Sequence, residues 1–443
     1  MPAERRASPA RAVAARVLRR TFEQGAFTDR AFQAEARGLA RRDRALAMHL
    51  AYGAVQRART LDHLIERAAE RPARAIDAPL LASLRLGCFE LCFAGGSAAH
   101  AAVDDAVELA KPAHGHALVN AVLRRIARER EALLAELSDA DAASAALAHS
   151  IPDWVAQMWW SELGPDAARA LMADANRPAE SALRANTLRA DVGALAGALG
   201  VRTAVPGEPP EAILALEPFD VFGSPQWRAG LLSAQSRASM LVAHALDPQP
   251  GERVLDLCAA PGGKTTHLAA LMGAEGEIVA VERHRGRARA LHLTAQRMGA
   301  VNVTVEIGDA TRPRRRGEHF ARVLLDAPCS GLGTLASHPD LRWRASAESA
   351  RALAEQQARL LSAAAVACAP GGVLVYSTCT VSAAENERQI GAFLDAHPAF
   401  AAIDLQERFP AWAHPRAAAH LLALGPVQGS EGFFISALRH ARG

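Results

Sequence analysis

Residues 253–265 read Arg-Val-Leu-Asp-Leu-Cys-Ala-Ala-Pro-Gly-Gly-Lys-Thr, and this stretch decides the fold of the C-terminal half of the chain. An apolar, β-branched run gives way to a glycine-rich turn and then to a helical pattern. This order is typical of an α/β unit in which the turn follows the carboxyl end of a parallel strand. Glycines there let the backbone approach a ligand closely, and the start of the next helix favours an anionic group. The stretch therefore predicts a ligand-binding edge of a parallel sheet.

The same alternation of strand and helix continues towards the C-terminus. A long helix is predicted over Ser346–Ala367. The predicted strands are Arg253–Leu257, Glu277–Glu282, Val301–Ile307, Arg322–Asp326, Gly372–Ser377 and Phe433–Arg439. Repeated units of this kind predict a mostly parallel sheet that helices cover on both faces.

Two more segments place a cysteine just beyond a predicted strand. One reads Asp326-Ala327-Pro328-Cys329-Ser330-Gly331, and the other reads Tyr376-Ser377-Thr378-Cys379-Thr380. The carboxyl ends of parallel strands meet at one edge of a sheet, so we expect both cysteines beside the glycine-rich turn. A thiol at such an edge is a candidate nucleophile rather than a core residue.

The other four cysteines carry no such signal. Cys88 and Cys92 lie one helical turn apart on an apolar face, which is typical of packing. Cys368 ends a predicted helix, and Cys258 lies in the turn, where its backbone matters more than its sulfur. No Cys/His set has zinc-site spacing, so we expect no metal ion. Free thiols and the lack of an export signal predict a reducing, cytoplasmic location.

The size, composition and charge of the chain limit the number of domains and the kinds of partner that can be expected. At 443 residues it predicts two or three domains. Half of the residues are apolar and 22% are charged, and no apolar run is long enough to cross a bilayer. A formal net charge of +3 permits an RNA partner without demanding one. Only two of the 50 basic residues are lysines, and Lys264 is in the glycine-rich turn, which indicates that an ammonium group is needed there.

Three regions are predicted along the chain. Residues 1–135 read as an all-helical domain whose first helix places Val13, Val17 and Leu18 on one face, and a transit peptide is the alternative for residues 1–20. An alanine-rich linker or weak helix follows. Residues 145–230 read as a small α+β module, and residues 231–443 carry the α/β pattern.

The glycine-rich turn has two nucleotide-binding interpretations. A phosphate-binding loop needs a glycine five positions before Gly263, and Cys258 stands there, so that motif fails. A Rossmann-like cofactor site needs an acidic residue at the end of the second strand, where Glu282 stands, and Asp309 follows the third strand. These two acids favour the second interpretation.

Together the three segments resemble the motifs of the Nop/Sun family of RNA cytosine-5 methyltransferases, and most closely its RsmB/Sun/Fmu type. Residues 1–135 resemble the NusB-like RNA-binding domain of that type. The resemblance implies a Rossmann-like class I methyltransferase domain with a mostly parallel seven-stranded sheet, preceded by an all-α NusB-like domain and a small α+β module. It also implies S-adenosyl-L-methionine as the cofactor, held by Cys258, Ala259, Ala260, Pro261, Gly262, Gly263, Lys264, Glu282, Asp309 and Asp326.

The resemblance implies catalytic roles as well. Cys379 would add to carbon 6 of cytosine and so make carbon 5 nucleophilic. Asp326 would donate a proton or hydrogen bond to ring nitrogen N3, and Lys264 would neutralise and orient Asp326 or lower a thiol pKa. Cys329 would assist release of the product. DNA cytosine methyltransferases use a Pro-Cys cysteine as the nucleophile, so the reverse assignment of Cys329 and Cys379 stays open.

Small-subunit 16S ribosomal RNA is the partner that the resemblance implies, with cytosine 967 as the target base. We expect a monomer with no membrane partner. The target base must leave its stack to reach the thiol. Two alternatives are the same chemistry on tRNA and a non-catalytic RNA-binding adaptor of ribosome assembly or antitermination.

Two segments are candidates for RNA contact. In His338-Pro339-Asp340-Leu341-Arg342-Trp343-Arg344, Trp343 is either a base-stacking residue or a buried structural one. Relatives usually carry arginines just before this segment, whereas Ala336 and Ser337 stand here. Arg124, Arg125, Arg128 and Arg130 form a basic cluster, for which a solvated helix face is the alternative.

Overall fold

The protein forms two compact units in the computed structural model, which describes residues 7–96, 98–312 and 317–442. The first unit comprises Met1–Pro178 with Leu335–Arg344, and the second comprises Ala179–Thr334 with Ala345–Gly443. Residues 145–178, which the sequence pattern places in the small module, fall in the first unit. The finer division into 1–135, 145–230 and 231–443 stays a prediction. Among the described residues, no helix has the length and apolar character needed to cross a membrane.

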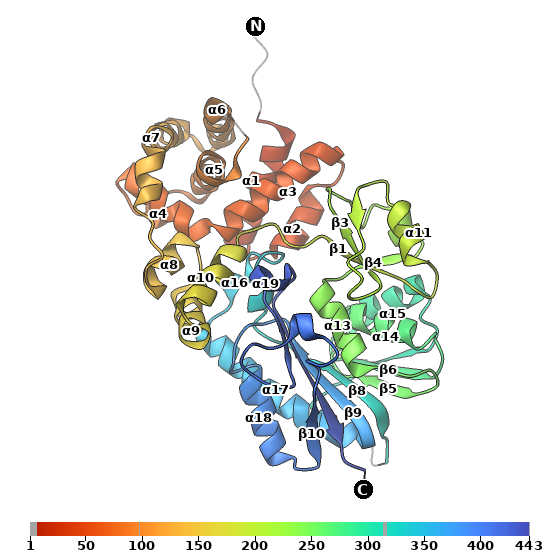
Figure 1. Ribbon diagram of the computed structural model, residues 1–443. Coiled ribbons are helices and arrows are strands. Elements are labelled where there is room, and N and C mark those ends of the chain that lie inside the picture. The colour runs from red at the N-terminus through yellow and green to blue at the C-terminus, as the bar shows by residue number, and fades with distance from the viewer. Residues whose placement is uncertain (1–6, 97, 313–316, 443) are drawn as a thin grey trace. The chain divides into compact units, whose positions relative to one another are not determined.

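The described part of the first unit consists of helices and loops (Figure 1). The predicted amphipathic first helix is confirmed over Pro9–Glu23, with Val13, Val17 and Leu18 buried in the core. Residues 1–6, which the transit-peptide alternative includes, lie outside the described residues. The helices are α1 (Pro9–Glu23), α2 (Thr28–Glu35), α3 (Arg41–Gln56), α4 (Ala58–Ala69), α5 (Ala78–Phe89), α6 (Ala99–Ala110), α7 (His116–Ala135), α8 (Ala142–Ala148), α9 (Asp153–Leu163), α10 (Pro165–Asp174) and α16 (Leu341–Arg344).

The alanine-rich stretch after α7 forms a true helix, α8. The Asp141 carboxylate accepts hydrogen bonds from the backbone N–H groups of Ala143 and Ser144, both at 2.9 Å, and the Ser144 hydroxyl caps the backbone of Asp141 in return. This capping box satisfies backbone groups that the start of a helix leaves unpaired. Of the two interpretations, linker or weak helix, the helical one is confirmed.

The segment Leu335–Arg344 belongs to the first unit, although it follows the Cys329 loop in sequence. The Arg342 side chain, in a residue that is 1% exposed, donates to the carbonyls of Gln56 and Ala175 at 2.9 and 2.8 Å. Trp343 donates from Nε1 to the carbonyl of Val55 at 2.8 Å, and its ring packs against the helical core. These contacts agree with the structural interpretation of Trp343 rather than with an open base-stacking platform.

The second unit contains an eight-stranded sheet in the order β10-β12-β9-β8-β5-β6-β7, with β11 paired to β12. Strands β5 to β9 are parallel, whereas β12 runs antiparallel to both β9 and β10. The predicted, mostly parallel sheet is confirmed, but it has an eighth strand, β11, in addition to the seven expected. The three residues of β11 are too few to show the alternating pattern of a strand in the sequence. The strands are β5 (Arg253–Asp256), β6 (Glu277–Glu282), β7 (Val303–Ile307), β8 (Phe320–Asp326), β9 (Cys368–Thr378), β10 (Phe400–Ile403), β11 (Leu421–Ala423) and β12 (Phe433–His440).

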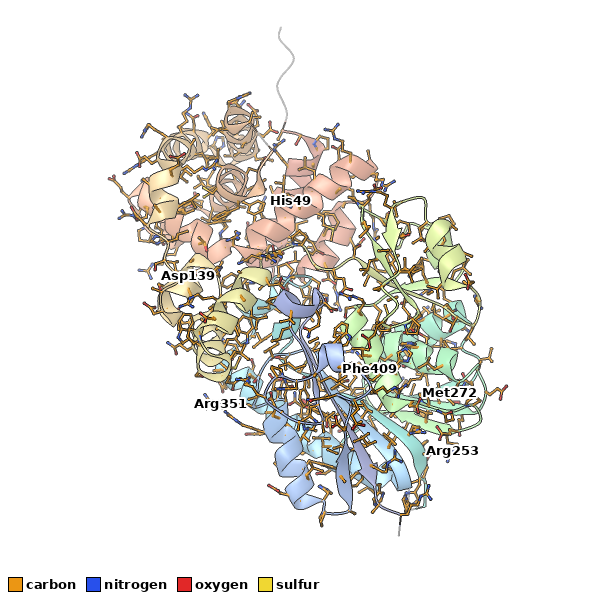
Figure 2. The ribbon with its side chains drawn as sticks, in the orientation of Figure 1. His49, Asp139, Arg253, Met272, Arg351 and Phe409 are labelled. Carbon is orange, nitrogen blue, oxygen red and sulfur yellow. The ribbon has the colours of Figure 1, made fainter. Side chains whose placement is uncertain are left out.

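Helices cover both faces of this sheet, as predicted (Figure 1). Adjacent residues of β5 point to opposite faces: Val254 packs with α13 and α14, and Leu255 packs with α17 and α18. Met272 and Phe409 lie in the first of these clusters (Figure 2). The helices are α13 (Arg237–Leu246), α14 (Gly263–Leu271), α15 (Arg285–Met298), α17 (Ala347–Ala367), α18 (Glu387–Ala396) and α19 (Gly425–Gln428).

Residues 179–234 form a separate antiparallel sheet in the order β2-β3-β1-β4. The first strand of this sheet ends at Ala185, and the Asn186 amide then donates to the carbonyls of Gly230 and Met298, both at 2.7 Å, which holds the turn that follows. The elements are β1 (Ala182–Ala185), α11 (Val192–Gly197), β2 (Thr203–Ala204), β3 (Ala212–Ala215), α12 (Pro225–Arg228) and β4 (Leu232–Ala234).

Candidate active site

The glycine-rich turn joins β5 to the N-terminus of α14, as the sequence predicts. Gly262 caps this helix with φ +104°, a conformation that L side chains rarely adopt. A Cβ atom there would lie 2.8 Å from the Leu291 side chain, so space as well as conformation requires glycine. The backbone N–H of Ala259 donates to the carbonyl of Val281 at 3.1 Å, which fixes the turn against β6. The turn therefore presents a helix N-terminus at the carboxyl edge of the sheet.

The two predicted acidic residues differ in their surroundings. Glu282, at the end of β6, is 5% exposed and accepts the backbone N–H of His284 at 2.8 Å. Arg287 lies 3.3 Å from the Glu282 carboxylate and also donates to the carbonyl of Ala260 at 2.7 Å, so it links this acid to the turn. Asp309 is exposed, and hydrogen bonds from Thr311 lower the pKa of its carboxyl. Both carboxylates lie at strand ends of the same edge.

Lys264, near the start of α14, and Asp326, at the end of β8, form a direct ion pair. The Lys264 ammonium donates to Asp326 Oδ2 at 2.8 Å, and the Ser377 hydroxyl donates to Asp326 Oδ1, also at 2.8 Å. Burial opposes the charge on Lys264, but the carboxylates of Asp326 and Asp256 outweigh it and raise the pKa of the ammonium. Asp326 thus has a cation and a hydroxyl on its two oxygens, which holds the carboxylate in one orientation.

Asp256 is a member of this edge to which sequence reasoning gave no role. The residue is 1% exposed and accepts a hydrogen bond from the Thr265 hydroxyl at 2.7 Å. Burial raises the pKa of Asp256 to about 7, and the nearby Asp326 carboxylate adds to the shift. The only sequence signal was its position at the end of the first strand of the α/β pattern.

Cys329 and Cys379 lie together, as predicted from their strand ends. Their sulfur atoms are 3.4 Å apart, and both residues are free, partly exposed cysteines. The hydrogen bond to Cys379 and burial raise the pKa of the Cys329 thiol well above its ordinary range. The Gly333 N–H donates to the Cys379 carbonyl at 3.0 Å, which fixes the second loop against the first. The raised pKa favours the protonated thiol of Cys329, and the sulfur contact itself allows either cysteine to be the donor.

Glu385 is a second residue that sequence reasoning missed. Its side chain is buried and accepts hydrogen bonds from the backbone N–H of Ser330 at 2.9 Å and from Gln357 at 3.0 Å. The Ser330 hydroxyl also contacts the Thr380 hydroxyl at 2.7 Å. Glu385 thereby holds the residue after Cys329 beside the residue after Cys379. A glutamate in a loop after β9 gives no sequence signal for this role, because its partners come from two other segments.

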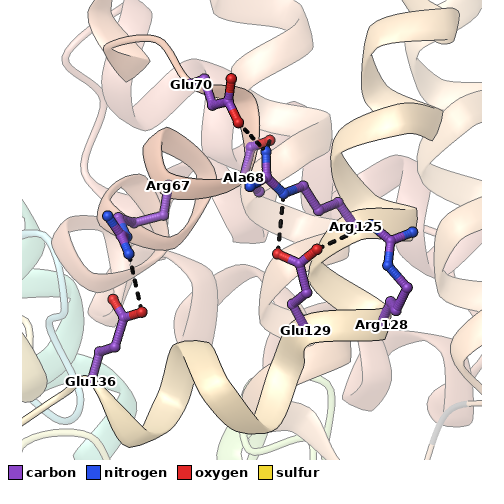
Figure 3. A network of polar contacts seen from close by, with 7 residues as sticks. All are labelled: Arg67, Ala68, Glu70, Arg125, Arg128, Glu129 and Glu136. Atoms are coloured by element: carbon purple, nitrogen blue, oxygen red, sulfur yellow. Dashed lines mark hydrogen bonds and ion pairs between the residues drawn. The ribbon is translucent and has the colours of Figure 1, made fainter.

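The predicted basic cluster on α7 is partly neutralised. Arg125 forms ion pairs with Glu70 at 2.7 Å and Glu129 at 3.1 Å, and Arg128 pairs with Glu129 at 3.0 Å (Figure 3). Arg125 also donates to the carbonyl of Ala68. These contacts agree with the alternative of a solvated helix face for these two arginines.

The edge of the large sheet thus gathers most of the predicted site in one place. The contacts join Lys264, Asp326 and Ser377 in one group, and Cys329 with Cys379 in another. Such a set offers a thiol nucleophile, a second thiol that carries a proton, and an acid–cation pair. The turn and the Glu282 carboxylate could hold a ligand that has a hydroxylated sugar.

Comparisons with known proteins find methyltransferase relatives that span most of the chain. Residues 243–439 match the family model described as 16S rRNA methyltransferase RsmB/F, and residues 8–128 match that of the NusB family. The probable ribosomal RNA small subunit methyltransferase B of Synechocystis sp. is 36% identical over 98% of this chain and 99% of its own length. The ribosomal RNA small subunit methyltransferase B of Thermus thermophilus is 37% identical over 90% and 89%. The crystal structure of PH0851 superposes with a TM-score of 0.80 at 27% identity, over 97% of this chain and 99% of that one.

Proposed function

Because the chain belongs to the RsmB/F family of 16S rRNA methyltransferases, we propose that it methylates carbon 5 of one cytosine in 16S ribosomal RNA through a covalent cysteine adduct. By resemblance the target is cytosine 967. The observation that carries the proposal is the pair of sulfur atoms 3.4 Å apart beside the Lys264–Asp326 ion pair. We expect the reaction to take place in the cytoplasm.

S-adenosyl-L-methionine is the cofactor of this family, and the residues present fit it. When bound, it supplies an electrophilic methyl group on a sulfonium sulfur. Glu282 offers a buried carboxylate for the ribose hydroxyls, and the turn of residues 258–264 offers backbone N–H groups at a helix N-terminus for the carboxylate of the amino acid part. Gly262 keeps that backbone open, because any side chain would meet Leu291. Asp309 and Asp326 complete the proposed set of contacts.

Cys379 is the proposed nucleophile. Its thiolate adds to carbon 6 of the cytosine, which gives carbon 5 enamine character and lets it accept a methyl group. Methylation at carbon 5 is followed by loss of the carbon 5 proton to a base and by cleavage of the bond between sulfur and carbon 6. Cys329, whose raised thiol pKa keeps it protonated, donates a hydrogen bond to the departing sulfur and so stabilises the released thiolate.

The Lys264–Asp326 pair is the proposed electrophilic partner of the base. Addition of a thiolate to carbon 6 places negative charge on the pyrimidine ring, and a hydrogen bond or proton at N3 stabilises it. The Lys264 ammonium donates to Asp326 Oδ2, so a proton that moves along this hydrogen bond to Asp326 can be delivered to N3, which leaves Lys264 neutral until it is reprotonated. Ser377 keeps the carboxyl group in place from the other side.

Transfer to defined RNA substrates tests the proposed substrate. Full-length protein is mixed with methyl-labelled cofactor and, separately, with protein-free 16S rRNA, assembled small subunits and tRNA. We expect one methyl group per 16S rRNA, at cytosine 967 and on carbon 5 when the product is mapped by mass spectrometry. Transfer to tRNA alone would replace the rRNA assignment. Tight RNA binding with no transfer to any of the three would identify a non-catalytic adaptor.

Trapping of the covalent intermediate tests the two cysteine roles. In the Cys329→Ser variant the adduct should form but release slowly, so RNA that stays attached to protein in denaturing gels should accumulate. The Cys379→Ser variant should give no adduct, and Cys92→Ser, which changes a thiol in the other unit, should behave as the wild type. Adduct accumulation in Cys379→Ser instead would reverse the assignment.

A further inference from the structure

Three potential metal ligands meet in the second unit, away from the two thiol loops in sequence. Glu211 lies directly before β3, His244 lies on α13 and His267 lies on α14. One ligand atom from each lies within 4.8 Å of the other two. His244 Nε2 is 3.0 Å from both oxygens of Glu211, and His267 Nε2 is 2.8 Å from Oε1. Two imidazoles therefore aim the same type of nitrogen at one carboxylate.

The spacing of these atoms suits a small divalent metal ion. Zinc bonds to histidine nitrogen and carboxylate oxygen are about 2.0–2.2 Å long, and tetrahedral geometry then separates ligand atoms by about 3.4 Å. The observed distances of 2.8 and 3.0 Å need only a few tenths of an ångström of opening. The two rings are nearly perpendicular, with an interplanar angle of 81° and centroids 5.3 Å apart.

His267 gives the second, independent observation. The residue is 1% exposed, and neither of its ring nitrogens has hydrogen-bonding geometry with any residue that the structure describes, although Nε2 is close to Glu211. A buried polar atom without a hydrogen bond is costly, and a coordination bond would satisfy Nε2.

We propose that Glu211, His244 and His267 bind one divalent transition-metal ion, for which zinc has the best-matched ligand set. Two imidazoles and one carboxylate are a common zinc ligand set that leaves a fourth position for water. The His244 side chain is 14% exposed, which gives the ion a route from solvent. The ligands are too far apart in the chain, at positions 211, 244 and 267, for the spacing rules that led us to expect no metal.

The site would join three elements that serve the cofactor turn. Glu211 belongs to the small sheet, and His267 lies one helical turn after Lys264 on the helix that begins at the glycine-rich turn. A metal ion held by all three ligands would fix the small sheet and α13 to α14. Metal removal should therefore weaken cofactor binding as well as lower the thermal midpoint.

A variant of Arg184 can test whether a cation binds at these three ligands. This arginine is buried and donates at 2.9 Å to the hydroxyl of Thr266, the residue directly before His267. A fixed positive charge near the ligands opposes a metal ion. The Arg184→Met variant should therefore bind zinc more tightly than the wild type, whereas a network of hydrogen bonds alone predicts no zinc binding in either protein.

The first experiment measures metal in untagged, full-length protein purified without chelators. We expect about one zinc per chain after dialysis, removed by EDTA together with a fall in the thermal midpoint that added zinc reverses. Glu211→Gln and His267→Gln should lose affinity by more than the ten- to hundredfold typical of outer-shell partners. His292→Gln, an exposed histidine on α15, is the matched control and should keep wild-type affinity.

A second experiment separates this site from the two thiols, which also bind zinc. Cobalt substitution should give absorption of a nitrogen and oxygen site, unchanged by Cys329→Ser and Cys379→Ser. An intense thiolate charge-transfer band that disappears in those variants would place the metal at the cysteines and overturn the proposal. Equal zinc content and equal midpoint shifts in the wild type and in the Glu211→Gln/His267→Gln double variant would also overturn it.

Discussion

Residues 326–334 and 335–344 are consecutive in the chain, and both are rich in residues that suggest function, yet they end in different structures. The first part holds Asp326 and Cys329 at a sheet edge, where their partners are other reactive side chains. The second part holds Arg342 and Trp343, whose partners are backbone carbonyls of the helical unit. Functional polar groups here contact one another, whereas structural polar groups contact the backbone.

The two regions also differ in how their buried polar groups affect the stability of the fold. A buried guanidinium that donates to several carbonyls satisfies groups that would otherwise be unpaired, so it contributes stability. The acids of the sheet edge lie close to one another, and Asp256 is buried near Asp326, which costs stability. Substitutions at the sheet edge should therefore lower the rate of methyl transfer with little loss of stability. Substitutions in residues 335–344 should instead lower the free energy of unfolding.

The largest effect is expected from Cys379→Ser. A hydroxyl is a far poorer nucleophile than a thiolate at neutral pH, so methyl transfer should fall by roughly 10⁴-fold or more, the scale seen when a catalytic nucleophile is removed. The free energy of unfolding should change little, because the substitution is nearly isosteric. Single-turnover transfer and urea unfolding measure the two quantities. A large loss of stability together with residual fast transfer would place Cys379 among the structural residues.

Arg342→Met should act in the opposite way. The variant leaves buried carbonyls, among them those of Gln56, Ser150 and Ala175, without their donor. Each buried acceptor left unpaired costs about 1–3 kcal/mol, so we expect a loss of about 3 kcal/mol or more. The exposed Arg351→Met is the control and should change stability by less than about 0.5 kcal/mol. Urea unfolding followed by helical circular dichroism measures both. A stable Arg342→Met protein with weak RNA binding would instead make Arg342 an RNA contact.

Asp256→Asn should stabilise the protein above neutral pH. The pKa of Asp256 is about 7 in the folded state against an ordinary value of 3.8, so the folded protein binds more protons between these values and its unfolding free energy falls as pH rises from about 4 to 7. Asparagine cannot ionise, so the variant should lack this fall and gain at most about 4 kcal/mol over the wild type at pH 8. The two proteins should be similar near pH 4.

Urea unfolding across this pH range provides the measurement for Asp256. Asp309→Asn is the control, because that exposed acid should not change the slope between pH 4 and 7 in the same direction. Parallel curves for the wild type and Asp256→Asn would mean that Asp256 titrates normally.

The smallest effect is expected from Trp343→Phe. It removes the hydrogen bond from Nε1 to the carbonyl of Val55 but keeps most of the apolar ring contact. A loss of about 1–2 kcal/mol in unfolding free energy is expected, with cofactor affinity unchanged. RNA affinity measured by filter binding should also stay within about twofold, whereas loss of a base-stacking residue would cost about 1–3 kcal/mol of binding.

Much of the sheet edge was predictable because it depends on local order along the chain. A strand, a turn and a helix are encoded by neighbouring residues, and parallel strands bring their carboxyl ends to one edge whatever the details of packing. This is why Lys264, Asp326, Cys329 and Cys379 were expected together, and their contacts agree. Glu385 and Asp256 were not assigned a role, because burial and partners from other segments give them their importance.

The amino-acid sequence by itself determined the α/β order of the second unit, the helical character of the first, and the strand ends at which two thiols meet, because each follows from short-range periodicity and chain direction. Only the tertiary structure decided that Arg342 and Trp343 belong to the helical unit and that Glu211, His244 and His267 meet. These outcomes depend on which segments pack together after the chain has folded, and no spacing along the chain encodes that choice.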